Sequence, residues 1–270
     1  MRAGSPGNFA RLLAPCLLFC AVAHGQNSSS SMKVVRILTP TIAAKYNLGL
    51  LCPSLAVTPN GVAVVGDGDH LWAVGAGGAI NVEGIHDAGS FAISPGGLLV
   101  VVSGTNLEYL DPSAKILKLV YTLPSTGMRI VAEGKDRFLL FGPDGAKGFA
   151  LYELLPGRRA VKIIDSPYPI TGVARNGEQL LVITGGALFS VSGNSMLLVA
   201  GEPGGALRSV AIDEDSQRVF LSDGSHTFEF KQAKLIPLFS DLGGELRWAG
   251  DGLLLFNPRQ RYLVQFTNLP

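Results

Sequence analysis

Three arginines and one glutamate interrupt an otherwise repetitive, apolar chain. Arg129 and Glu245 each begin a short apolar run, Arg208 precedes another such run, and Arg247 lies two residues after Glu245. Guanidinium groups bind carboxylate and phosphate oxygens through paired hydrogen bonds, so a fold that gathers these side chains would hold a small anion. The alternative is structural, with Arg208 and Arg247 neutralised by Glu245.

A second candidate lies in the loop of residues 84–87, which ends in His86 and Asp87. These two side chains either take part in a ligand site or form an ordinary hydrogen-bonded loop. Residues 66–70 read Gly-Asp-Gly-Asp-His, but Leu71 stands where a calcium loop would need another oxygen ligand, so we predict a tight turn there.

Catalytic signatures are absent from the sequence. It contains no Gly-x-Ser-x-Gly elbow, no phosphate-binding glycine loop and no His-Glu-x-x-His pair. We therefore predict no catalytic residue, no metal and no cofactor. Trp72 and Trp248 lie within strand-like runs and are predicted to pack between elements rather than to stack on a sugar.

The strands that position these residues are predicted by a sequence repeat that occurs six times. Each copy has a polar residue, three mostly apolar residues and a turn, and successive copies are about 40 residues apart, the length of a propeller blade. The copies begin at Ser54, Ser90, Arg129, Thr171, Ser209 and Glu245.

Each copy contains short β-type runs separated by Gly, Asp, Asn and Pro. In the second copy we expect strands at residues 91–94, 98–102, 107–110 and 116–121. The second run of each copy is almost continuously apolar, which indicates burial on both faces. The pattern predicts an all-β, six-bladed β-propeller with four antiparallel strands per blade. The third and sixth blades then face each other, with Arg129 opposite Glu245 across the mouth of the central channel.

The last copy is one strand short, while residues 34–38 have the pattern of an outermost strand and no blade of their own. We predict that this N-terminal strand completes the last blade and closes the ring, which removes an open sheet edge. A short helix is expected at residues 41–48, ended by Gly49.

The first 25 residues are typical of a secretory signal, with Arg2 and Arg11 before a short apolar region at residues 12–23. We expect residues 1–25 to be a signal peptide, 26–33 a flexible leader and 34–270 a single propeller domain in a secreted or periplasmic protein. Pro15 and Phe19 argue against lipid attachment at the cysteines that follow them. Only Cys52 lies beyond the signal, so no intramolecular disulfide is expected.

The composition argues against nucleic acid as a binding partner and against a membrane-spanning segment. The formal net charge is +1 and charged residues make up 16% of the chain, so no field exists that would attract nucleic acid. No apolar stretch after the signal is long enough to cross a bilayer. We expect a monomer whose partner is a protein or a small anionic ligand.

Residues 209–224, Ser-Val-Ala-Ile-Asp-Glu-Asp-Ser-Gln-Arg-Val-Phe-Leu-Ser-Asp-Gly, are similar to the inner hairpin of an NHL blade. Over roughly residues 34–268 the repeats resemble the six-bladed propeller group that includes NHL-repeat and TolB-like proteins. This resemblance implies a fold rather than an activity, because propellers serve as binding modules and as enzymes.

With no catalytic signature, the leading expectation is an exported, non-catalytic binding module that uses one face of the ring. The alternative is a metal-dependent, lactonase-like hydrolase of the gluconolactonase type with its site at the channel mouth. Such an enzyme needs several acids or amides at the channel, and the aligned first positions supply only Glu245. Two or more further acids there would reverse the order of these two hypotheses.

Overall fold

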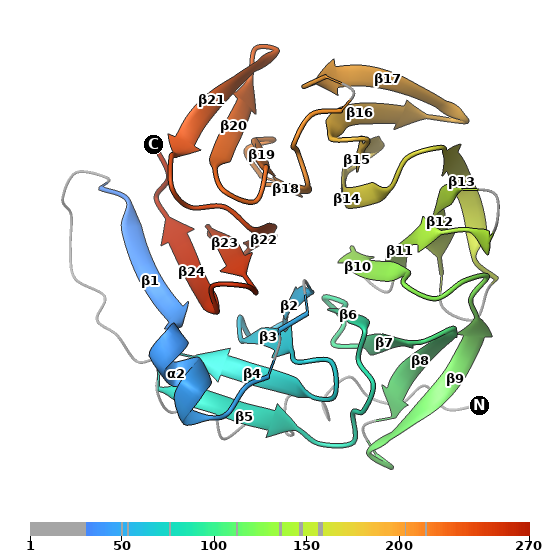
Figure 1. Cartoon of the computed structure of the whole chain (residues 1–270), viewed down its shortest axis with the longest axis vertical. Coiled ribbons are helices and arrows are strands. Elements are labelled where there is room, and N and C mark those ends of the chain that lie inside the picture. The colour runs from blue at the N-terminus through green and yellow to red at the C-terminus, as the bar shows by residue number, and fades with distance from the viewer. Residues whose placement is uncertain are drawn as a thin grey trace.

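The computed structural model describes residues 31–270 except 50, 53, 76, 112, 135–136, 146–147, 156–158, 203 and 214. Six four-stranded antiparallel sheets surround a central channel (Figure 1). The predicted six-bladed propeller is therefore confirmed. The expected signal peptide and most of the expected leader lie outside the described residues.

Within a blade the strands follow one another outward from the channel. Blade 1 contains β2 (Leu55–Val57), β3 (Ala63–Gly66), β4 (Leu71–Gly75) and β5 (Gly78–Val82). Blade 2 contains β6 (Ser90–Ile93), β7 (Leu99–Ser103), β8 (Asn106–Asp111) and β9 (Ile116–Thr122). Blade 3 contains β10 (Arg129–Glu133), β11 (Arg137–Pro143), β12 (Phe149–Leu154) and β13 (Val161–Ser166).

The remaining three blades complete the ring. Blade 4 contains β14 (Ile170–Asn176), β15 (Gln179–Thr184), β16 (Ala187–Ser192) and β17 (Ser195–Ala200). Blade 5 contains β18 (Ser209–Ile212), β19 (Val219–Ser222), β20 (Thr227–Lys231) and β21 (Lys234–Phe239). Blade 6 contains β22 (Glu245–Ala249), β23 (Gly252–Asn257), β24 (Tyr262–Thr267) and, as its outer strand, β1 (Lys33–Leu38).

The strand β1 closes the ring as predicted. It pairs antiparallel with β24 in the register Lys33↔Thr267 to Leu38↔Leu263, and Leu38 is completely buried. Among the described strands β1 is the first in the chain and β24 is the last, and the two lie side by side in Figure 1.

The one helix among the described residues, α2 (Pro40–Lys45), is earlier and shorter than predicted. Thr39 begins it, because its Oγ1 accepts a hydrogen bond from the Ile42 amide at 3.2 Å, and Pro40 follows at a position that suits proline. The helix ends before Gly49 because Asn47 already adopts a left-handed backbone with φ of 52°.

The core lies between neighbouring blades. The second strands are buried on both faces, as their apolar runs predicted. Phe220 of blade 5 stacks on Trp248 of blade 6 with ring centroids 5.5 Å apart. Trp72 packs against the core between blades 6 and 1, and its indole Nε1 donates to the carboxylate of Asp67, in the turn between β3 and β4, at 2.7 Å.

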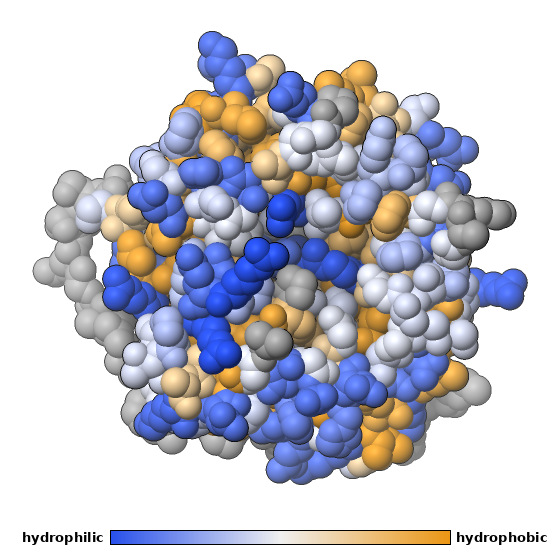
Figure 2. Space-filling model, viewed as in Figure 1, coloured by the Kyte–Doolittle hydropathy of each residue, from blue (hydrophilic) through white to orange (hydrophobic). Residues whose placement is uncertain are grey.

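The ring has two unlike faces. Figures 1 and 2 view the face that carries the connections from one blade to the next, and hydrophilic side chains cross its centre in Figure 2. The opposite face carries the turns between the first and second strand of each blade. No helix in the described part of the chain is long and apolar enough to cross a membrane.

Candidate functional site: a channel pocket lined by an arginine

The first positions of the inner strands gather at the connection end of the channel. Arg129 and Glu245 meet there directly, with Nη2 and Oε2 3.0 Å apart, and Arg129 Nη1 donates to the Thr171 carbonyl at 3.0 Å. The two side chains face each other from opposite blades, as the alignment predicted, and they form an ion pair rather than standing apart.

Serine hydroxyls complete this polar end of the channel. The Ser54 and Ser90 hydroxyls lie 3.0 Å apart, and Ser90 Oγ also accepts a hydrogen bond from the Ile130 amide at 3.1 Å. Ser209 Oγ accepts from the Leu246 amide at 2.9 Å. We refer to Ser54, Ser90, Arg129, Thr171, Ser209 and Glu245 as the polar ring. The side chains of this ring are hydrogen-bonded to the blades or to one another, except that of Thr171, which takes part through its carbonyl while its buried hydroxyl has no hydrogen-bond partner among the described residues.

The structure places the other predicted residues differently. Arg208 is exposed, and His86 and Asp87 are exposed in the loop between β5 and β6. The His86 ring lies 5.9 Å from the His70 ring, while Asp87 has a left-handed φ of 56°. None of these three residues lines the channel pocket described next.

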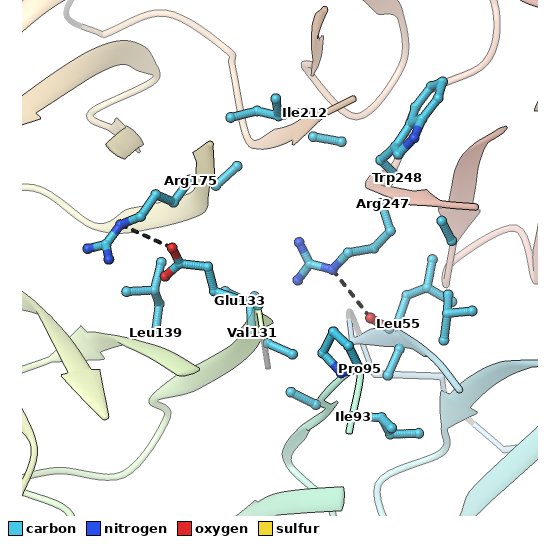
Figure 3. A pocket seen from close by; sticks show the side chains of 18 of the residues that line it. Leu55, Ile93, Pro95, Val131, Glu133, Leu139, Arg175, Ile212, Arg247 and Trp248 are labelled. Atoms are coloured by element: carbon cyan, nitrogen blue, oxygen red, sulfur yellow. Dashed lines mark hydrogen bonds and ion pairs between the residues drawn. The ribbon is translucent and has the colours of Figure 1, made fainter. Parts of the chain in front are cut away.

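A cavity of about 600 Å³ occupies the channel beyond the polar ring. Its lining reaches the turns between first and second strands, at Pro59, Gly61, Gly134 and Gly250. The blades run anticlockwise from blue to red in Figure 1 and clockwise in Figure 3, so the two pictures view opposite faces. Because the turns that line the pocket lie on the face opposite the connections between blades, the pocket extends toward the face away from the polar ring.

Arg247 is the predicted residue that lines this pocket. Its side chain points toward the centre of the channel, and its Nε donates a long hydrogen bond, 3.4 Å, to the Leu55 carbonyl (Figure 3). Within the described residues no carboxylate is in ion-pair contact with Arg247, because Glu245 binds Arg129 instead. Burial lowers the pKa of Arg247 to about 10, an effect that the charge of Glu245 opposes and that of Arg129 reinforces.

Two acids that the sequence analysis did not single out as site residues also line the pocket, Glu133 and Asp215. Figure 3 shows Glu133 on the other side of the channel from Arg247. Arg175 Nε lies 3.2 Å from Glu133 Oε1, and Arg175 Nη1 lies 3.0 Å from Glu153 Oε1. The ion pair with Arg175 fixes the position of the Glu133 carboxylate at the pocket wall.

The signal that would have found Glu133 is strand alternation. Side chains two residues apart point to the same face of a strand, so the channel receives the first, third and fifth residues of an inner strand. In β10 these are Arg129, Val131 and Glu133, and in β22 the third residue is Arg247. The first positions of the repeats, taken alone, include neither Glu133 nor Arg247.

The described residues do not fit a divalent metal. They contain no group of three His, Cys, Asp or Glu side chains arranged to hold an ion. Glu245 is bound by Arg129 and Glu133 by Arg175, so each of these carboxylates already has a cationic partner. The metal that the lactonase-like alternative called for has no donor set here, and no chemical step below depends on one.

The fold and the pocket define a class, the six-bladed propellers with a ligand-sized channel cavity. No protein-family model matches the sequence, and no curated protein matches it. A gluconolactonase from Xanthomonas campestris is similar in structure, with 15% identity, 93% of this chain and 99% of that chain covered, and a TM-score of 0.64.

Two further structures illustrate the range of similar folds. A protein provisionally named a gluconolactonase is 11% identical, with 88% of this chain and 93% of that chain covered and a TM-score of 0.64. A catalytically inactive variant of virginiamycin B lyase from Staphylococcus aureus is 9% identical, with 80% of each chain covered and a TM-score of 0.57. At these identities the likeness establishes the shared fold.

The expectation of a non-catalytic binding module is corrected by these findings. Structures that match almost the entire chain carry gluconolactonase names, which favours the lactonase-like alternative. Strand alternation also points the third and fifth residues of an inner strand into the channel, and Glu133 is the fifth residue of β10. Glu133 on the inner strand β10 and Asp215 in the turn after β18 are further acids at the channel.

Proposed function

We propose that the protein is a lactonase-like hydrolase that opens a small cyclic ester in the channel pocket without a metal ion. The observation that carries this proposal is Arg247, a half-buried guanidinium that faces the cavity with only a long backbone hydrogen bond and whose pKa is lowered by its surroundings. A cation that is partly removed from solvent stabilises negative charge that develops on a substrate better than a fully solvated one does. The fold shared with gluconolactonases supports the reaction type.

In the proposed reaction the lactone carbonyl oxygen lies against the Arg247 guanidinium. A water oxygen forms a bond to the carbonyl carbon while Glu133 accepts one proton from that water. Arg247 stabilises the negative charge on the former carbonyl oxygen. The ring C–O bond then breaks, the leaving alkoxide takes the proton from Glu133, and the acid product ionises and releases one proton to solvent.

The proposal is tested by the hydrolysis of δ-lactones followed with a pH indicator, because each turnover releases one proton. Arg247→Met should lower kcat by about 10²–10³-fold, the usual loss when an oxyanion donor is removed, and Arg247→Lys should retain part of the rate. Arg259→Met, at an exposed turn between β23 and β24, is the matched control. A folded wild-type protein that hydrolyses no lactone faster than buffer does would refute the proposal.

Two properties of the whole chain belong to the same proposal. We propose that it is exported, because residues 1–25 have the pattern of a secretory signal, and that it acts as a monomer toward small molecules. N-terminal sequencing of the protein recovered outside the cytoplasm, expected to begin near residue 26, together with its mass in solution, tests both points.

A further inference from the structure

The inner strands of blades 3 and 6 each turn one backbone edge toward the channel, outside the ladder to the second strand. In β10 the Ile130 amide points to this edge, because it donates to a serine hydroxyl of blade 2, and the Leu246 amide of β22 donates likewise to a serine of blade 5. In an antiparallel pair every second residue directs both its N–H and its C=O to the same edge. The N–H and C=O of Ala132 and Trp248, each two residues further on, therefore lie on the channel edge too.

In the described part of the chain these backbone groups of Ala132 and Trp248 have no partner. Both residues line the pocket, and neither forms a hydrogen bond on this edge with another described residue. Each edge thus offers one strong donor and one strong acceptor to water or to a ligand. A ligand that displaces this water must replace its hydrogen bonds, because an unpaired buried N–H or C=O is unfavourable.

The free backbone groups lie beside the two side chains of the proposed reaction. Ala132 directly precedes Glu133, and Trp248 directly follows Arg247. Each free N–H and C=O is therefore one residue, about 3.3 Å along the strand, from a reacting side chain. Figure 3 shows Arg247 and Glu133 on opposite sides of the channel. A substrate whose ester lies between these side chains has backbone donors and acceptors next to it on both sides.

A secondary amide matches these edges. Its N–H and its C=O point in opposite directions from one rigid plane, so it pairs with a free carbonyl and a free N–H at once. A peptide that binds the open edge of a sheet uses the same pairing. The substituent should also be neutral, because Asp215 lies exposed at the pocket opening, has no ion pair among the described residues and disfavours a second anion.

From these edges we infer that the substrate is a lactone with a neutral acylamino group on the carbon next to the ester carbonyl. The ester carbonyl lies against Arg247, the amide carbonyl accepts from the Ala132 N–H, and the amide N–H donates to a free edge carbonyl. This inference rests on the proposed function for the reaction but adds a substrate class that the reaction does not require.

The kinetic test compares N-butanoyl-homoserine lactone with its carba-analogue, in which a CH₂ group replaces the amide N–H and the ring is unchanged. The wild-type protein should show at least a fivefold higher kcat/KM for the amide, after subtraction of the spontaneous rates, because the analogue leaves an edge carbonyl unpaired. Equal rates for the two compounds, or hydrolysis of δ-lactones but of neither compound, would overturn this inference and leave the hydrolase function intact. Hydrolysis of no lactone at all would refute the proposed function instead.

A binding measurement separates recognition from catalysis. Titration calorimetry of the wild-type protein with the ring-opened acids of both compounds should show at least fivefold tighter binding of N-butanoyl-homoserine. Arg247→Met should weaken the binding of both acids, because their carboxylate loses its cation. Equal or tighter binding of the carba-analogue would contradict recognition of the amide whether or not the protein hydrolyses lactones.

A proline substitution tests the edge itself. Ala132→Pro removes the N–H that faces the channel and removes no ladder hydrogen bond. It should lower kcat/KM for N-butanoyl-homoserine lactone at least fivefold more than for γ-butyrolactone, which has no amide. Ala132→Gly keeps the N–H and is the matched variant, in which both substrates should change by the same factor. Equal losses on both substrates in Ala132→Pro would contradict pairing with this edge, and the two measurements on the wild-type protein stand whether or not this variant folds.

Discussion

Single hydroxyl groups link the blades at the polar ring. Ser90 Oγ accepts from the amide of Ile130, and Ser209 Oγ accepts from the amide of Leu246. In each case the amide belongs to the second residue of the next blade's inner strand. At these two positions the polar residue that begins the repeat therefore has a structural role, because its hydroxyl forms a hydrogen bond between neighbouring blades.

We expect Ser90→Ala and Ser209→Ala to destabilise the fold by about 1–3 kcal/mol each, because each leaves a buried amide without its acceptor. Ser113→Ala is the control, since its hydroxyl binds Asp111 in an exposed turn. Chemical denaturation monitored by tryptophan fluorescence measures the three values. Losses no greater than that of the control would show that these hydrogen bonds contribute little.

Substitution of Glu133 tests its proposed role as the base that accepts a proton from water. Glu133→Gln should lower kcat for lactone hydrolysis by about 10²–10⁴-fold, because an amide cannot accept the proton from water. Glu153→Gln is a close control: Glu153 also binds Arg175, but it does not line the pocket. A similar loss in both variants would indicate that the ion-pair network, and not proton transfer by Glu133, supports the reaction.

At the scale of elements, the stability of the ring depends on β1. Leu38 is fully buried, whereas Val34 of the same strand is 48% exposed. Leu38→Ala should therefore cost about 2–5 kcal/mol, the usual effect of truncating a buried leucine, and Val34→Ala much less. Thermal unfolding compares the two variants with a chain that lacks residues up to 38, whose midpoint should fall furthest. An unchanged midpoint in the truncated chain would contradict closure by β1.

The repeat pattern predicted the blades, the order of strands and the closure by β1, because these follow from local turns and apolar runs. It did not predict which inner-strand positions reach the pocket. Arg247 is the third residue of β22 and Glu133 the fifth residue of β10, and both line the pocket, whereas Glu245, the first residue of β22, does not. Counting alternate residues along each strand was needed to find the two pocket residues. That Glu245 binds Arg129 and not Arg247 depends on distances across the ring, which repeat spacing does not encode.

At the scale of the whole molecule, the channel has one polar end and one open pocket, and two of its acids, Glu133 and Glu245, are paired with arginines. We expect EDTA to leave lactone hydrolysis unchanged, because the described residues contain no set of side chains suited to a divalent ion. Rates before and after dialysis against the chelator, with the released metal quantified, provide the measurement. Loss of activity that added calcium or zinc restores would contradict a metal-free reaction.

The pairing of β1 with β24 also constrains how the molecule forms. Five blades are built from strands that are neighbours in sequence, and such local contacts form quickly. The sixth blade needs a strand made before all the others and one made after them, so its loop-closure entropy is the largest in the fold. During synthesis, β1 has no partner until β24 has emerged, and assembly of the ring ends with that encounter.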